Sequence, residues 1–287
     1  FYEERLFFAG TTHQPQSIFG SVSADFENHT PGINDDDAVN ITIASDQVNV
    51  IKHLLPGRFL QILTTSAEFT LSGGTGTQPV TPTNVNVLRE TTFGTSQVRP
   101  LRAGNSTILV QKGTEKVKEI TFDLDTDGLL GVDLTVLADH ITRGGITDMI
   151  WQQEPELILW FVGADGALIG LTYDRANGTV GWHGHQLGDS GIVESITAIP
   201  SGAEDQVYLS VKRTINSATV RHIVFLKSIN FGSDITDAFF VDSGLTYSGS
   251  ATTTITGLNH LEGETVQILA DGSAHADKTV SGGSITL

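Results

Sequence analysis

The stretch from residue 146 to residue 185 decides the fold of this chain. It reads Ile146-Thr-Asp-Met-Ile-Trp151, Leu157-Ile-Leu-Trp-Phe-Val162, Ala167-Leu-Ile-Gly-Leu-Thr-Tyr173 and Thr179-Val-Gly-Trp-His-Gly-His185. Short apolar or alternating runs are typical of β-strands, and the second run is apolar throughout, as in a strand covered on both faces. Ala164-Asp165-Gly166 and Asn177-Gly178 are turn signals, and Asn-Gly predicts a type I′ turn. The stretch therefore predicts a four-stranded antiparallel unit.

Similar units recur along the chain. Apolar runs begin near Ile51, Val98, Ile146 and Ile192, at steps of 47, 48 and 46 residues. Each step holds about four short strands, the size of a β-propeller blade. Residues 5–21 contain two strands of a further unit. We therefore expect an all-β fold, a β-propeller-like domain of about five blade units that is not closed by this chain alone. An irregular β-sandwich is the alternative, and the best helix candidate is the short stretch 134–141.

The pattern predicts two domains. The β-propeller-like domain covers residues 1–237, with an acidic, polar connection at 22–50 and a linker at 229–236. A small β domain covers residues 238–287, with strands at 264–269 and at 279–280 with 284–287. Because the chain begins with Phe and ends in what looks like mid-strand, we expect a fragment of a longer polypeptide, truncated at the C-terminus of the small domain.

The charge of the chain limits its partners. It has 33 acidic and 16 basic residues, a net charge of −17, and no cysteine. Such a surface repels nucleic acid and anionic membranes, which argues against a site that grips phosphate. It would suit a conduit through which DNA slides without sticking. Acidity that only keeps a large β protein soluble explains the charge equally well. Without cysteine, disulfides and thiolate metal sites are excluded.

Two clusters have the residue types of a metal site. Asp123, Asp125, Asp127 and Gly128 match the first half of a calcium loop, but Leu134 stands where the loop needs a bidentate Glu, so a simple hairpin turn is the alternative. His183 and His185 share one face of a strand, and no third ligand is evident beside them. Surface histidines are the alternative there.

The other chemical motifs are incomplete. The Gly-rich run Ser72–Gln78 has no Lys and no following helix, so it is no phosphate loop. The chain contains no Gly-x-Ser-x-Gly elbow, and no pair of carboxylates stands out by its spacing. The arginines form no basic run, and most are expected to be solvated or paired with acids. We therefore assign no catalytic, cofactor-binding or metal residue, expect no cofactor, and predict that the protein is not an enzyme.

Several ordered segments resemble one family. The first are Arg5-Leu-Phe-Phe-Ala-Gly10, Pro15-Gln-Ser-Ile-Phe-Gly-Ser21 and Asp25-Phe-Glu-Asn28. Later ones include Trp151-Gln-Gln-Glu-Pro155, Leu171-Thr-Tyr-Asp-Arg175, Arg213-Thr-Ile-Asn216 and the tail from Leu261-Glu-Gly263 to Val280-Ser-Gly-Gly283. In this order they resemble the tail nozzle proteins, or tail tubular protein B, of short-tailed bacteriophages. The resemblance covers nearly the whole chain.

The resemblance implies a structural protein of the virion tail, made in the host cytoplasm. Such proteins form a ring, by family analogy a hexamer, that is part of the conduit for DNA ejection. The implied partners are copies of the chain, a tail adaptor and tail fibre or spike proteins. DNA would pass without specific binding, and this fragment would not insert into a membrane. The family offers no catalytic residues to transfer.

Two other functions stay open. A propeller lectin or adhesin could bind host-surface glycan, with Trp151, Trp160, Trp182 and the four tyrosines as stacking platforms, although their place in apolar strands favours core packing. A polysaccharide hydrolase is the third reading, but nothing in the sequence identifies its acid or nucleophile.

Overall fold

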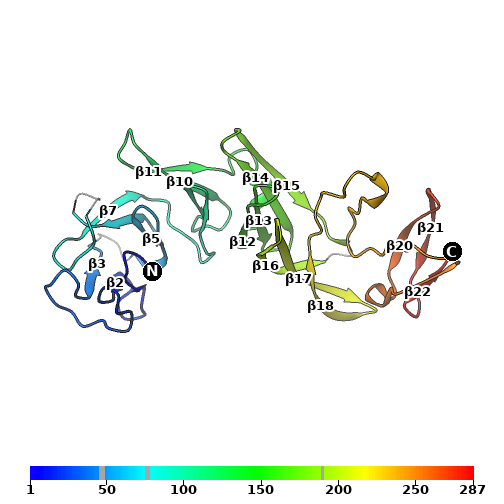
Figure 1. The fold of residues 1–287 in the computed structure, drawn as a ribbon, viewed down its shortest axis with the longest axis horizontal. Helices are drawn as coiled ribbons and strands as arrows, with labels where there is room; N and C mark the ends of the chain where they lie inside the picture. Colours follow the sequence, from blue (N-terminus) through cyan, green and yellow to red (C-terminus); the bar gives the residue numbers. More distant parts are fainter. Residues whose placement is uncertain (45–48, 75–77, 189–190) are drawn as a thin grey trace. The chain divides into compact units, whose positions relative to one another are not determined.

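The chain is all-β and divides into two compact units. A computed structural model describes residues 1–44, 49–74, 78–188 and 191–287 (Figure 1). The first unit is Phe1–Trp151 and the second is Gln152–Leu287. Small antiparallel sheets follow one another along the sequence. Within each of the first five sheets, every strand pairs with the strand before or after it in the chain. The C-terminal part departs from this order. The sequence instead predicted a domain boundary near residue 238, and that boundary stays a prediction.

The first sheet has three strands around a buried arginine. Its strands are β1 (Phe7–Ala9), β2 (Ser17–Gly20) and β3 (Val39–Thr42). The sequence predicted the first two and took residues 22–50 as a connection, so β3 corrects that prediction. Arg5 is buried and its guanidinium donates to the backbone oxygens of Ser21, Asp35, Asp36 and Asp37. Arg5 is therefore an exception to the expectation that most of the arginines are solvated or paired with acids.

The second sheet has the most completely buried strands. It contains β4 (Ile51–Leu55), β5 (Leu60–Thr64), β6 (Glu68–Ser72) and β7 (Asn86–Thr91). All five residues of β5 and of β6 are buried, although both strands contain polar residues, so these strands are covered on both faces. The sequence did not predict β7, because its residues are polar and show no alternation.

The third sheet begins three residues after its predicted start. It contains β8 (Leu101–Ala103), β9 (Ser106–Val110), β10 (Val117–Asp123) and β11 (Gly128–Asp133). The hairpin between β10 and β11 brings Asp123 opposite Gly128. The helix predicted over 134–141 is reduced to a single turn, α1 (Asp139–Thr142), which follows the sheet.

The fourth sheet is the unit from which the fold was predicted. It contains β12 (Ile146–Gln152), β13 (Ile158–Gly163), β14 (Leu168–Asp174) and β15 (Thr179–His185). The predicted type I′ turn at Asn177-Gly178 is wrong, because only Gly178 has a positive φ. The connection is a four-residue turn in which Gly178 donates to the Arg175 oxygen, and the Asp174 side chain accepts from the Asn177 amide. This side-chain bond replaces the backbone geometry that the dipeptide suggested.

The fifth sheet has three strands. It contains β16 (Ile192–Ser201), β17 (Glu204–Ile215) and β18 (Ala218–Phe225). Asn216 and Ser217 both have positive φ and join β17 to β18, which is the arrangement of a type I′ hairpin turn. Every second residue of β17 from Val207 to Ile215 is buried, so only one face of this sheet is covered.

The C-terminal part forms two small strand pairs. They are β19 (Thr254–Thr256) with β22 (Ser284–Thr286), and β20 (Thr265–Ala270) with β21 (Ser273–Thr279). Leu258, Val280 and Ile285 form their buried core. The predicted linker at 229–236 overlaps the short 3-10 turn η2 (Ile235–Asp237). None of the helices in the described residues is long and apolar enough to cross a membrane.

Candidate functional site

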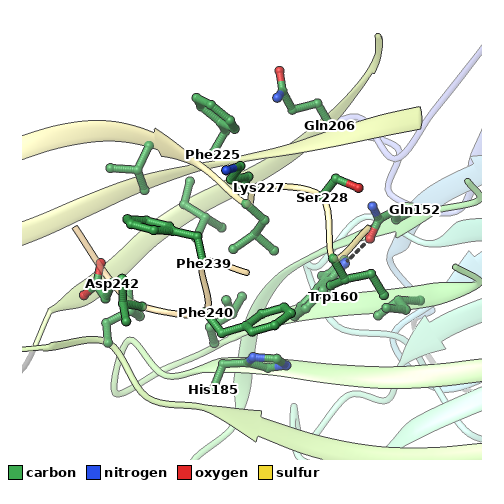
Figure 2. A pocket seen from close by; sticks show the side chains of 18 of the residues that line it. Gln152, Trp160, His185, Gln206, Phe225, Lys227, Ser228, Phe239, Phe240 and Asp242 are labelled. Atoms are coloured by element: carbon green, nitrogen blue, oxygen red, sulfur yellow. Dashed lines mark hydrogen bonds between the residues drawn. The ribbon is translucent and has the colours of Figure 1, made fainter. Parts of the chain in front are cut away.

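The second unit contains a cavity of about 670 Å³ beside the fifth sheet. Residues of β18, of the end of β15 and of the segment 226–244 line it (Figure 2). Phe225 and Phe240 keep 53% and 67% of their surface exposed, so aromatic rings stand open to solvent at the cavity. Gln206, Lys227 and Ser228 add polar groups to a lining that is otherwise mostly apolar.

Trp160 closes the cavity from the core side. It is buried, and its indole Nε1 donates to Gln152 Oε1 at 2.8 Å (Figure 2). Gln152 Nε2 in turn donates to the Asp205 oxygen at 2.9 Å. This chain of bonds satisfies the one polar atom of a buried indole. Of the other tryptophans suggested as stacking platforms, Trp182 is stacked on Phe161 and Trp151 is half-buried, so these rings pack within the fold.

His183 and His185 lie together on β15, as their spacing predicted. Nδ1 of His183 and Nε2 of His185 are 2.7 Å apart, so one nitrogen must donate and the other accept. The His185 ring also lies 4.9 Å from Trp160. Burial lowers the pKa of both imidazoles, and the neighbouring His183 lowers the pKa of His185 further. The geometry therefore favours the neutral rings.

A glycine makes room for this histidine pair. His183 is opposite Gly170 in the register of β14 and β15, and a Cβ at position 170 would lie 2.0 Å from the imidazole. The His183 imidazole therefore lies over Gly170, where the Cβ of any other residue would collide with the ring. Within the described part of the chain, no three His, Cys, Asp or Glu side chains gather as a metal site would need.

An ion pair holds the segment that covers the cavity. Arg213, which is buried on β17, donates through Nη2 to both Asp242 oxygens at 2.8 and 2.7 Å. The same arginine donates through Nη1 to the Gly188 oxygen, and Asp242 accepts from the Gly188 amide. Lys227 Nζ lies 5.4 Å from the centre of the Phe239 ring, a cation–π contact within the same segment. The segment is thus fixed at one end by charge.

The aspartates of the half calcium loop serve the hairpin between β10 and β11. Asp123 Oδ2 accepts from the amide and the hydroxyl of Thr126, so this carboxylate caps the turn. Asp127 has a positive φ directly before Gly128. The arrangement is that of the turn alternative. In the Gly-rich run, residues 75–77 lie outside the described residues, and Gly73 pairs with Gln78.

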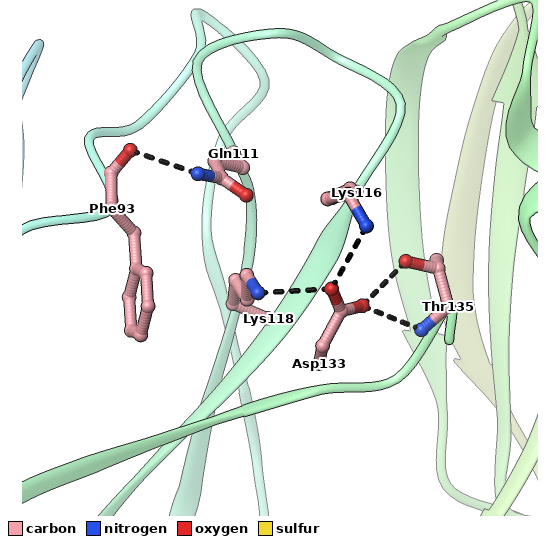
Figure 3. Close-up of polar contacts among 6 residues, drawn as sticks. All are labelled: Phe93, Gln111, Lys116, Lys118, Asp133 and Thr135. Atoms are coloured by element: carbon pink, nitrogen blue, oxygen red, sulfur yellow. Dashed lines mark hydrogen bonds and ion pairs between the residues drawn. The ribbon is translucent and has the colours of Figure 1, made fainter.

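A polar cluster that the sequence did not indicate surrounds Asp133. Lys116 and Lys118 both donate to Asp133 Oδ2, and Thr135 donates its amide and hydroxyl to Oδ1 (Figure 3). Burial alone would raise the pKa of Asp133, but these hydrogen bonds outweigh it and hold the pKa well below its usual value. The cluster fixes the end of β11.

Comparisons with known proteins add little. No protein-family model matches the chain, and no curated protein matches it. Among solved structures, a luciferin-regenerating enzyme is similar with a TM-score of 0.33 and 12% identity, over 78% of this chain and 87% of that one. That solved structure is an enzyme, which contradicts the prediction that this chain is not one. So weak a similarity assigns no reaction, substrate or catalytic residue to this chain.

Proposed function

We propose that this chain is a structural component of a phage tail nozzle, built as a β-propeller-like domain followed by a small β domain. The supporting observation is the tandem series of four-stranded meanders, whose first strands begin at Ile51, Leu101 and Ile146, followed by the unit at Ile192. Sheets of this size that repeat in one chain are the units from which propellers are built.

The proposal gives the chain an architectural role. Copies of the chain would form a ring, by family analogy a hexamer, around the channel through which DNA leaves the virion. A tail adaptor and tail fibre or spike proteins would contact the ring. A net charge of −17 suits such a conduit, because acidic walls repel the phosphate backbone and let it pass.

Labelling of intact particles tests this proposal. Antibodies raised against the purified chain should bind the distal tail of phage particles produced by cells that carry the gene, as seen by electron microscopy. Antibodies against the major capsid protein serve as the control and should decorate only the head. Particles whose tails bind no antibody against this chain, although the antibody recognises the purified protein, would refute the nozzle assignment.

The cavity supports a second candidate, binding of a host-surface glycan. Exposed aromatic rings beside amide and ammonium groups are a common arrangement for sugar recognition, and Phe225, Phe240, Gln206 and Lys227 provide it. Phe240→Ala should then abolish binding on a glycan array, whereas Phe8→Ala, which removes an exposed ring in the first unit, should leave it unchanged. Absence of binding by the wild-type chain across the array would refute this candidate.

A further inference from the structure

The described part of the cavity lining carries an excess of acidic groups. It contains one lysine and four acidic residues, which are Lys227, Glu156, Glu204, Asp205 and Asp242. Arg213 neutralises Asp242 through the ion pair described above. Three carboxylates and one ammonium group therefore remain on a wall that is otherwise mostly apolar.

The three remaining carboxylates come from two segments that are tied to each other. Asp205 Oδ2 accepts from the amides of Gln153 and Glu154 at 2.8 and 3.2 Å, and the Asp205 amide donates to the Glu154 oxygen at 2.9 Å. Glu156 follows in the same loop, and Glu204 precedes Asp205 at the start of β17. Backbone contacts therefore hold the acidic groups at one place on the cavity.

These carboxylates keep unused acceptor sites. An ionised carboxylate has about four lone-pair sites, and Glu204 fills one of them by accepting from the Ser228 hydroxyl at 2.8 Å. Glu156 is exposed, and among the residues that the structure describes no donor reaches its carboxylate. No described cation pairs with any of the three carboxylates. A positive group that enters from solution would therefore find free partners, and the apolar surroundings would strengthen the attraction.

The basic groups at the cavity do not neutralise its acidic side. The Lys227 ammonium contacts the Phe239 ring, and within the described chain it forms no ion pair. Burial lowers the pKa of His185, so the imidazole adds no positive charge near neutral pH. The cavity therefore attracts cations and repels anions.

Aromatic rings lie beside this acidic side. Figure 2 shows Asp242 and Ser228 on opposite sides of the view, with Phe239 and Phe240 between them. Because Ser228 donates to Glu204, the acidic groups belong to the side of Ser228. A ligand whose body lies against the rings could therefore extend a positive group to the carboxylates.

We propose that the cavity binds a glycan unit that carries a protonated amino group and rejects acidic sugars. The sugar ring would lie against Phe240, and its ammonium group would donate to Glu156. The other carboxylate oxygens would accept from sugar hydroxyls, whereas a carboxylate on the sugar would meet like charge. The inference rests on the glycan-binding candidate above and adds the class of sugar.

Calorimetric titration of the purified chain with three related sugars tests the class of ligand. Glucosamine carries an amino group, glucose has a hydroxyl in its place, and glucuronic acid carries a carboxylate. Glucosamine should bind at least about fivefold more tightly than glucose, because a charge-assisted hydrogen bond is stronger than a neutral one. Glucuronic acid should not bind at about 10 mM. Added salt should weaken the binding of glucosamine and leave that of glucose unchanged.

Two variants with the same change in net charge locate the effect. Glu156→Gln should weaken glucosamine binding at least about threefold and keep glucose binding within about twofold of the wild type, because it removes the carboxylate charge and leaves a hydrogen-bonding side chain. Glu115→Gln is the matched control, because Glu115 is equally in the exposed class and lies in the first unit. It should leave the affinities for both sugars unchanged. Equal losses in the two variants would mean that the overall charge attracts the amine, which overturns the site.

The remaining outcomes separate this inference from the functions on which it depends. Equal affinities for glucosamine and glucose overturn the amine preference and leave the glycan-binding candidate standing. Cyclohexylamine, an apolar ring with the same amino group, should bind more weakly than glucosamine, and equal or tighter binding overturns the sugar as the ligand. Absence of binding to every sugar here and on the glycan array refutes the candidate and the inference together. Antibody labelling of the tail decides the nozzle assignment independently.

Discussion

The second sheet and the fifth sheet use the same meander in opposite surroundings. The central strands β5 and β6 of the second sheet are buried at every residue, whereas β17 of the fifth sheet is buried only at alternate residues. The outer strand β18 is exposed at five of its eight residues. The same backbone pattern is therefore covered on both faces in one sheet and on one face in the other.

Removing the buried cation of the fifth sheet should have the largest effect on stability. Arg213→Ala leaves Asp242 without its partner and should lower the free energy of unfolding of the second unit by about 3–5 kcal/mol. Arg221→Ala is the matched control, because its ion pair with Glu194 is exposed, and it should cost less than about 1 kcal/mol. Urea unfolding measures both. Equal losses would mean that the covered face of this sheet contributes no more than its open face.

A cavity in the second sheet should cost nearly as much. Leu63 is fully buried, and Leu63→Ala should lower the free energy of unfolding by about 2–5 kcal/mol through lost apolar burial and the cavity left behind. Ile223→Ala on the exposed outer strand of the fifth sheet is the control and should change the monomer by no more than about 0.5 kcal/mol. Thermal unfolding at low protein concentration would show both. A loss at Ile223 as large as that at Leu63 would contradict the difference between the sheets.

The pH dependence of stability should have opposite signs in the two sheets. Burial raises the pKa of Glu68, although hydrogen bonds from Thr91 and Phe93 lower it in part. A carboxyl group whose pKa is higher in the folded state than in the unfolded state stabilises the folded protein at low pH. This contribution is lost as the pH rises above the ordinary pKa of about 4.5. Glu68→Gln should therefore gain stability relative to the wild type between pH 4 and about pH 7.

The control for this titration lies on the fifth sheet. The hydrogen bond from Arg221 lowers the pKa of Glu194, so its contribution is present above its unfolded pKa and is lost as the pH falls. Glu194→Gln should lose stability relative to the wild type as the pH rises, by a smaller amount. Urea unfolding of both variants across this pH range measures the slopes. Parallel slopes would mean that burial at Glu68 does not control its protonation.

The smallest expected effect is at the turn between β17 and β18. Ser217 has φ of 62°, a left-handed conformation that costs energy for any residue with a Cβ. Ser217→Gly relieves this strain and should stabilise the hairpin by about 0.5 kcal/mol, after the entropy that glycine loses on folding is deducted. Gly178→Ala, at a positive φ in the turn before β15, should act in the other direction in the same thermal unfolding measurement. No gain at Ser217 would mean that the turn carries no strain.

The sequence indicated the inner strands far better than the outer ones. The run Ile158–Gly163 is apolar throughout, as a strand buried on both faces requires, and that pattern is readable without a structure. β7 and β11 are polar or irregular, and β3 lies in an acidic connection. These strands form because an inner strand leaves an edge to pair, which is a property of the neighbouring strand and not of their own residues.

The candidate site divides in the same way. The spacing of His183 and His185 placed them on one face of a strand, and the structure confirms that they lie together. The Arg213–Asp242 pair that fixes the segment over the cavity joins residues 29 positions apart, whose sequence positions give no sign of contact.

The sequence by itself determined that this is an all-β chain of repeated antiparallel units with an acidic surface. Short apolar runs, turn residues and charged side chains are local properties, so each can be read from the sequence without knowing which segments meet. Only the tertiary structure decided which polar groups are buried and which atoms they contact. Arg5 is enclosed by backbone oxygens from residues about thirty positions away, and the cavity beside β18 is lined by residues from Gln152 to Gly244. Such contacts depend on how chain segments meet in space, where burial favours a hydrogen-bond partner for most polar groups.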